Sequence, residues 1–120
     1  MSNRMLVACP SSPNCVSTQA QDAGHAIVPI RYHKSRAEAK EALKTAIQSL
    51  PRTKLVEEEG PYLHYEFTSL LLRFVDDVEF IFDDETKTLH FRSASRTGYS
   101  DLGANRRRME QVRALVRESL

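Results

Sequence analysis

The feature that most constrains this chain is a change of hydrophobic period along it. Between residues 62 and 94 apolar and polar residues alternate, which is typical of strands with one buried face. On either side, residues 35–51 and 103–118 carry apolar residues three and four positions apart, which indicates amphipathic helices. Since both helix stripes must be buried against an apolar sheet face, we expect the two helices on the same side of one sheet.

Local signals mark where the helices begin and end. Ser35 and Glu38 form a capping box, in which each side chain satisfies a free backbone N–H at the start of the first helix. Pro51 ends that helix, because proline has no backbone N–H to continue the ladder. Ser100 or Asp101 is expected to cap the second helix, since both residue types favour that position.

Short strands separated by turns complete the predicted fold. The connections after the first helix are short, so antiparallel pairing is expected. Pro29 places the first strand at a sheet edge, because proline cannot donate to the ladder. Residues 74–77 indicate a break or bulge. The predicted strands are residues 26–32, 53–58, 62–72, 78–83 and 89–94.

The resulting order, β-α-β-β-β-β-α, predicts an α+β fold with a single antiparallel sheet and two helices on one face. It matches a half-repeat of the TATA-binding-protein-like fold, with a helix-grip sheet as the nearest alternative. A length of 120 residues fits one domain, residues 1–120. Residues 8–24 are rich in Ser, Pro, Asn, Gln and Gly without an apolar period, so residues 1–24 are expected to form an irregular arm.

Targeting signals and membrane segments are not expected. The chain has no apolar run of about 18 residues, so no integral membrane segment is predicted. The apolar stretch before Cys9 covers only residues 5–8, which is shorter than the core of a secretory signal. A cytoplasmic protein is therefore predicted.

The two cysteines lie close together in the sequence C-P-S-S-P-N-C. Cys9 and Cys15 lack the spacing and the partners of a structural zinc site, so no structural metal is expected. Three alternatives remain open. They are free thiols in an N-terminal loop, which a reducing cytosol favours, a small local disulfide, or redox or metal chemistry of the two thiols.

Four blocks of sequence carry a family resemblance. They are CPSSPNCVS at residues 9–17, YLHYEF at 62–67, FVDDVEF at 74–80 and RSASRTGYSDLGANRRR at 92–108. In this order they resemble domain of unknown function family 1499, over nearly the whole chain. The resemblance implies a small domain found in bacteria, cyanobacteria and plastids, and it implies no particular reaction. Some members carry a leader or a membrane segment, and we expect neither here.

The net charge of +1 conceals a segregation of charge. Residues 57–85 hold ten acidic residues and one base, Arg73, a net −9. Residues 92–120 hold seven arginines, no lysine and three acidic residues, a net +4. Arginine presents a planar fork that binds a carboxylate or a phosphate through two hydrogen bonds. The basic end can therefore serve either internal pairing or anion binding.

Two interpretations of the arginines follow. In the first, they pair inside the fold with Asp76, Asp77 and Glu79. In the second, they bind a small anion beside the start of the second helix, whose free N–H groups and dipole favour negative charge. The residues expected around that anion are Arg92, Ser93, Ser95, Arg96, Tyr99, Ser100, Asn105 and Arg106, with Asp76 and Asp77 nearby.

The sheet face away from the helices offers a second set of candidates. His64, Glu66 and His90 point to that face in the predicted alternation, where they can form an acid–base or metal-binding set, or a solvated polar face. Ile81 shares the face, which favours a homodimer through it. Nucleic acid is not expected as a partner, because Glu66 and Glu79 repel phosphate.

Known catalytic signatures are missing from the sequence, including G-x-S-x-G and the glycine-rich phosphate loops. No cofactor is expected. The leading interpretation is a non-enzymatic binding or interaction module that takes a small anionic ligand. One rival is an enzyme that uses Asp76, Asp77, Arg92 and Arg96. The other is a structural or protein-interaction domain. Internal pairing of the arginines would favour this interpretation.

Overall fold

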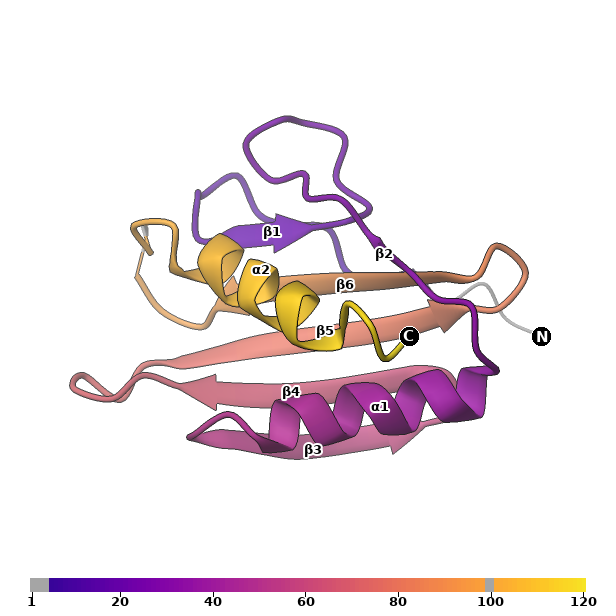
Figure 1. Ribbon diagram of the computed structural model, residues 1–120. Coiled ribbons are helices and arrows are strands. Elements are labelled where there is room, and N and C mark those ends of the chain that lie inside the picture. The colour runs from indigo at the N-terminus through magenta and orange to yellow at the C-terminus, as the bar shows by residue number, and fades with distance from the viewer. Residues whose placement is uncertain (1–4, 99–100) are drawn as a thin grey trace.

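The computed structural model describes residues 5–98 and 101–120, so the predicted roles of Tyr99 and Ser100 lie outside the described residues. Figure 1 shows both helices against the same face of one sheet. The elements are β1 (Cys15–Ser17), β2 (Ile30–Arg31), α1 (Arg36–Gln48), β3 (Thr53–Glu59), β4 (Tyr62–Thr68), β5 (Val75–Asp83), β6 (Thr88–Ser95) and α2 (Ala104–Val116).

The sheet has the strand order β1-β6-β5-β4-β3. β2 also pairs with β6, at residues 88–89, whereas β1 pairs with β6 at residues 92–94. All pairs between named strands are antiparallel. This confirms the predicted α+β class, the single sheet, and the placement of both helices on one side. Pro29 directly precedes β2, which pairs only with β6, so the predicted edge position fits the missing N–H of proline.

The start of α1 follows its local sequence signal, whereas the N-cap of α2 is Gly103, without a side-chain cap hydrogen bond, and not Asp101 as predicted. In α1 the Ser35 hydroxyl accepts a hydrogen bond from the Glu38 N–H, and the Glu38 carboxylate accepts one from the Ser35 N–H. In α2 the Asp101 carboxylate accepts from the N–H groups of Gly103 and Asn105, at 2.8 and 3.0 Å. Gly103 has φ +82°, a left-handed conformation that glycine adopts without strain. Asp101 thus closes the turn into α2.

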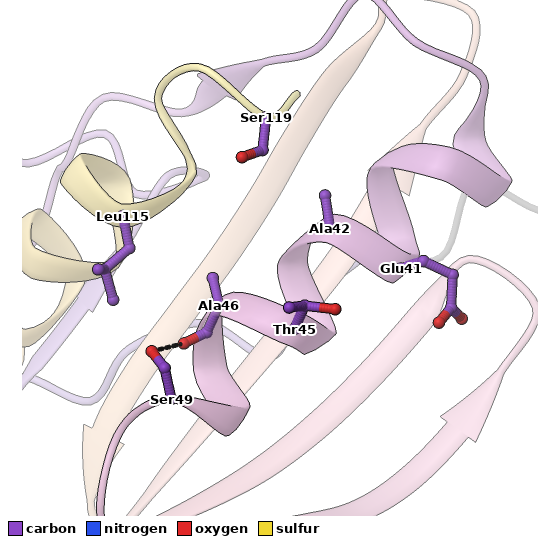
Figure 2. Close-up of a pocket in the computed structure, with 7 residues that line it drawn as sticks. All are labelled: Glu41, Ala42, Thr45, Ala46, Ser49, Leu115 and Ser119. Atoms are coloured by element: carbon purple, nitrogen blue, oxygen red, sulfur yellow. Dashed lines mark hydrogen bonds between the residues drawn. The ribbon is translucent and has the colours of Figure 1, made fainter.

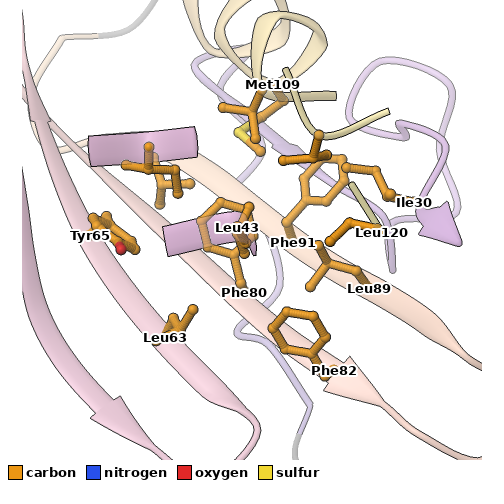
Figure 3. Packing of buried hydrophobic residues seen from close by; sticks show 14 of the residues in the cluster. Ile30, Leu43, Leu63, Tyr65, Phe80, Phe82, Leu89, Phe91, Met109 and Leu120 are labelled. Atoms are coloured by element: carbon orange, nitrogen blue, oxygen red, sulfur yellow. The ribbon is translucent and has the colours of Figure 1, made fainter. Parts of the chain in front are cut away.

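The core lies between the sheet and the helices (Figure 3). Alternate residues of the central strands point to this side, and Leu63, Phe80 and Phe91 have no exposed surface. Neighbouring rings of this face meet at centroid distances near 6.3 Å. Leu43 of α1 and Met109 of α2 complete the layer and are also fully buried. The alternation of period two therefore places the intervening polar residues on the outer face of the sheet.

Two features differ from the prediction at β4 and β5. The strand predicted over residues 62–72 ends at Thr68, and the predicted break at 74–77 lies inside β5 from Val75 onward. Ser69 and Phe74 close the connection, because the Ser69 N–H donates to the Phe74 carbonyl and the Phe74 N–H donates to the Ser69 hydroxyl, both at 2.9 Å. We call residues 69–74 the apolar loop.

The N-terminal part contains one strand that the sequence did not predict. β1 (Cys15–Ser17) lies within the segment expected to be irregular, and β2 is shorter than the predicted strand 26–32. Three residues are too few to show a hydrophobic period, so only the partner strand β6 reveals β1. Among the described residues, no helix is long and apolar enough to cross a membrane.

Candidate functional site

A buried polar network joins α2 to the strands on the helix side of the sheet. Asn105 is fully buried at its centre. Its amide nitrogen donates to the Asn14 carbonyl, the Ser95 hydroxyl and the Asp101 carboxylate, and its amide oxygen accepts from the Ser93 hydroxyl. Ser93, Ser95 and Asp101, which were predicted around an anion or as a helix cap, therefore all bond to Asn105.

Arg108 connects this network to the acidic strand β5. Its Nη2 lies 2.7 Å from Asp76 Oδ2, and its Nη1 donates to Asn105 Oδ1 at 2.9 Å. The guanidinium also lies over the Phe67 ring, 5.2 Å from its centroid. The side chains of Arg108 and Asp76 are 16% and 9% exposed, so this is a largely buried ion pair. Sequence analysis did not single out Arg108, although its place in the RRR run of α2 was visible.

The contacts of Asp101 and Arg106 also lie within the fold. Burial tends to raise the pKa of Asp101, but hydrogen bonds from Asn105 and Gly103 hold that pKa below its usual value. Arg106 turns to the segment before β2, where its guanidinium donates to the carbonyls of Ala26 and Gly24. The predicted anion ligand Arg106 thus fixes a loop.

On the outer face, Arg96 binds two carboxylates. Its Nε donates to Asp77 Oδ2 at 2.8 Å and its Nη2 to Glu66 Oε2 at 2.6 Å. His64 Nε2 lies 2.8 Å from the other oxygen of Asp77. The hydrogen bond from Arg96, joined by that with His64, lowers the pKa of Asp77 despite partial burial. The predicted candidates His64 and Glu66 therefore belong to one ion-pair cluster with Arg96.

A second outer-face cluster surrounds Glu79. The Tyr62 hydroxyl donates to one of its oxygens, and Arg92 Nη1 lies 3.6 Å from the other. Arg92 Nε is buried, and it is the one buried side-chain polar atom in the described part of the chain without a hydrogen-bond partner. His90 shares a 2.9 Å hydrogen bond with Thr18, and burial lowers the pKa of its imidazole.

The structure divides the predicted catalytic set between two faces. Asp76 points to α2, whereas its neighbour Asp77 points to the outer face with Arg96. His64 and His90 also stay apart, since β5 lies between their strands and they stand opposite Glu79 and Ile81 respectively. In the described ranges no group of three His, Cys, Asp or Glu side chains is arranged to hold a metal ion.

An N-terminal strap, residues 5–14, reaches the outer face at Leu6. Leu6 packs on Tyr62 and Ile81, and further along the strap Cys9 forms a disulfide with Cys15 of β1. The structure therefore has the disulfide, one of the alternatives that the sequence left open. Ile81 is only 6% exposed beneath Leu6, so the apolar patch that favoured a homodimer is covered by the chain itself. The homodimer stays a prediction without that support.

Figure 2 shows a groove of about 460 Å³ between α1 and the C-terminal part of the chain. Its wall is made mostly of small side chains, and Glu41 is its one titratable residue. Glu41 lies 3.4 Å from Lys44, so it is not isolated. The groove contains none of the predicted site residues. Its lining residues are Glu41, Ala42, Thr45, Ala46, Ser49, Leu115 and Ser119.

The apolar loop is the candidate that sequence analysis missed. Four of its six residues are large and apolar, and their exposed fractions run from 53% to 86%. These are Leu70, Leu71, Leu72 and Phe74. A signal was available, because three consecutive leucines break the alternation expected of a half-buried strand. The strand predicted over residues 62–72 is therefore wrong for this segment.

The comparison with known families finds a match over nearly the whole chain. The model of a family described as a protein of unknown function (DUF1499) matches residues 5–116, nearly the whole chain. The chain belongs to this family. The match includes the four sequence blocks that carried the resemblance, and it assigns no reaction to them. No curated protein and no solved structure matches the chain.

Proposed function

We propose that this protein is a non-enzymatic interaction module whose contact surface is the apolar loop. The observation that carries the proposal is the exposure of four large apolar side chains on one six-residue connection. Scattered single apolar residues are normal on a protein surface, whereas a contiguous cluster marks a binding surface. The closed neck between Ser69 and Phe74 keeps the cluster away from the core.

The use of the arginines supports interaction over catalysis. Arg96 and Arg108 bind carboxylates, and Arg106 binds main-chain carbonyls. Their hydrogen-bond donors serve the fold, so they offer little to a substrate. The rival enzyme also needs Asp76 and Asp77 in one site, and neighbouring residues of a strand face opposite sides.

The disulfide between Cys9 and Cys15 indicates in which cellular compartment the protein resides. Disulfides persist in oxidising surroundings and are rare in a reducing cytosol. The Cys9–Cys15 bond therefore favours an oxidising compartment over the cytoplasm expected from the sequence. Alkylation of the native protein, followed by mass spectrometry, tests this. If both cysteines are alkylated before reduction, the disulfide is absent and a reducing compartment is favoured instead.

A photo-crosslinking residue tests the contact surface without assuming the partner. It is placed at Leu71 in the apolar loop and, as a matched control, at Val28, which is 70% exposed on another part of the surface. Irradiation of cells that make the protein is expected to give a discrete adduct, protein or lipid, from position 71 only. Equal labelling from both positions, or none from position 71, would overturn the proposal.

One observation favours a second candidate function, the binding of a small anion at Arg92. Its Nε is buried without a hydrogen-bond partner, so one donor is left unpaired beside Glu79. An anion there would have to overcome the negative charge of Glu79. Thermal denaturation in the presence of phosphate, sulfate and small carboxylates tests this function. A saturable rise in melting temperature that Arg92→Lys removes would support it, and no rise with any anion would exclude it.

A further inference from the structure

The apolar loop projects from one end of the sheet. Figure 1 shows the connection between β4 and β5 extending past the start of β3, on the far left of the view. The loop is held as a tip rather than folded back, because Ser69 and Phe74 bond to each other across its base. The apolar side chains therefore lie on a convex feature of the surface.

A convex apolar tip suits a fluid apolar phase better than a preformed protein pocket. Leu70, Leu71 and Leu72 are consecutive and all more than 60% exposed. Consecutive residues of a tight loop point in different directions, so a flat partner would cover only some of them. The interfacial region of a membrane can surround all of them, because lipid chains adapt to the shape of an inserted group.

Two cations stand at the base of this tip. Arg73 is an exposed residue of the loop itself, and Arg52 is bound to the last residue of β4 by its Nε, which donates to the Thr68 carbonyl at 3.0 Å. The ion pairs found within residues 5–98 and 101–120 include neither Arg52 nor Arg73. The nearby carboxylates Glu66 and Asp77 are both bound by Arg96.

We propose that the apolar loop inserts into the interface of an anionic lipid membrane, with Arg52 and Arg73 at the level of the phosphate headgroups. The inference rests on the proposed function and names its partner. Apolar side chains supply the insertion and the cations supply the preference for negative lipids, a combination that peripheral membrane proteins need because either alone binds weakly. Long arginine side chains can reach the headgroups while their stems cover apolar surface.

The absence of tryptophan from the chain provides a direct probe. In Leu71→Trp the single indole reports only on the loop. With vesicles of phosphatidylcholine and phosphatidylserine, its emission is expected to shift to the blue and to become protected from an aqueous quencher. A tryptophan placed at Val28, in Val28→Trp, is expected to show neither change.

Flotation of the full chain with the same vesicles measures affinity. Leu71→Ser is expected to lower the partition coefficient by about tenfold, since it removes one inserted leucine. Val28→Ser is the control and is expected to leave partition unchanged. The double variant Arg52→Gln/Arg73→Gln should bind vesicles with and without phosphatidylserine equally. Added salt should weaken binding of the wild type but not of that variant.

The outcomes separate the inference from the proposed function. If the wild type fails to bind phosphatidylserine vesicles while position 71 crosslinks to a protein, the lipid surface is wrong and the interaction module stands. If position 71 gives no adduct and the vesicles do not bind, both are wrong. Binding that Leu71→Ser leaves intact also overturns the lipid inference, because the loop would then not be the inserted element. Circular dichroism of each variant checks that it folds.

Discussion

Replacement of Asn105 by alanine is expected to destabilise the fold by about 3 kcal/mol. Asn105 is fully buried, and its amide bonds five groups, on Asn14, Ser93, Ser95, Asp101 and Arg108. If this network is structural, as the geometry indicates, its loss reduces stability. If it serves a ligand, its loss leaves stability largely intact.

The magnitude follows from the hydrogen bonds. The amide nitrogen has two hydrogens for its three acceptors, so about four bonds are lost in all. At about 1 kcal/mol net for each bond, the loss is about 4 kcal/mol. Alanine returns roughly 0.6 kcal/mol through its higher helix propensity. A domain of this size has a total stability of about 5–15 kcal/mol, so the effect is a large share of it.

Urea denaturation followed by circular dichroism measures the change. Gln111→Ala is the matched control, because Gln111 is an exposed amide on the same helix, and its loss should cost less than about 0.5 kcal/mol. Asn105→Asp should also be destabilising, since it replaces a donor 2.6 Å from the Asp101 carboxylate with a second acceptor. A loss below about 1 kcal/mol for Asn105→Ala would refute the structural role of the network.

Three further outcomes are expected. Asp76→Asn should cost about 3 kcal/mol in urea denaturation, because it leaves a largely buried Arg108 without its counter-charge, and adding Arg108→Met should recover part of that loss. Cys9→Ser/Cys15→Ser should lower stability by about 2 kcal/mol, measured under non-reducing conditions against the oxidised wild type. Arg96 and His64 hold the pKa of Asp77 low, so the stability due to its carboxylate should be present above its unfolded pKa of about 4 and be lost as pH falls through the lower folded pKa. The stability difference between wild type and Asp77→Asn should therefore shrink below about pH 4, and a constant difference down to pH 2 would contradict this assignment.

Local signals in the sequence determined the secondary structure well. The capping box at Ser35 and the alternation through Leu63, Tyr65 and Phe67 depend on neighbours a few residues away, and the structure confirms both. The charge segregation was also visible in the sequence. One of its two interpretations was that arginines of the basic end pair with carboxylates of the acidic middle. The register of the strands determines which of these charges meet. Asp77 stands opposite Glu66 and Ala94, close enough to Arg96 for two hydrogen bonds.

The candidate site depended on contacts that no local signal encodes. Leu6 covers Ile81 across 75 residues of chain, and Asn14 reaches Asn105 across 91. Such contacts are set by where the sheet places distant segments. The leucines at 70–72 were predicted to be buried in a strand because they are hydrophobic. In the structure they are exposed to solvent, in a loop that is closed by hydrogen bonds between Ser69 and Phe74.

By itself, the sequence determined the α+β class, the two helices and the face to which most residues of the central strands point, because hydrophobic period and end signals act over a few residues. Only the tertiary structure decided which charges pair, that Leu6 covers Ile81 on the outer face, and that the apolar loop does not join the core. These depend on strand register and on long-range packing, since a shift of one residue along a strand would turn every side chain to the opposite face.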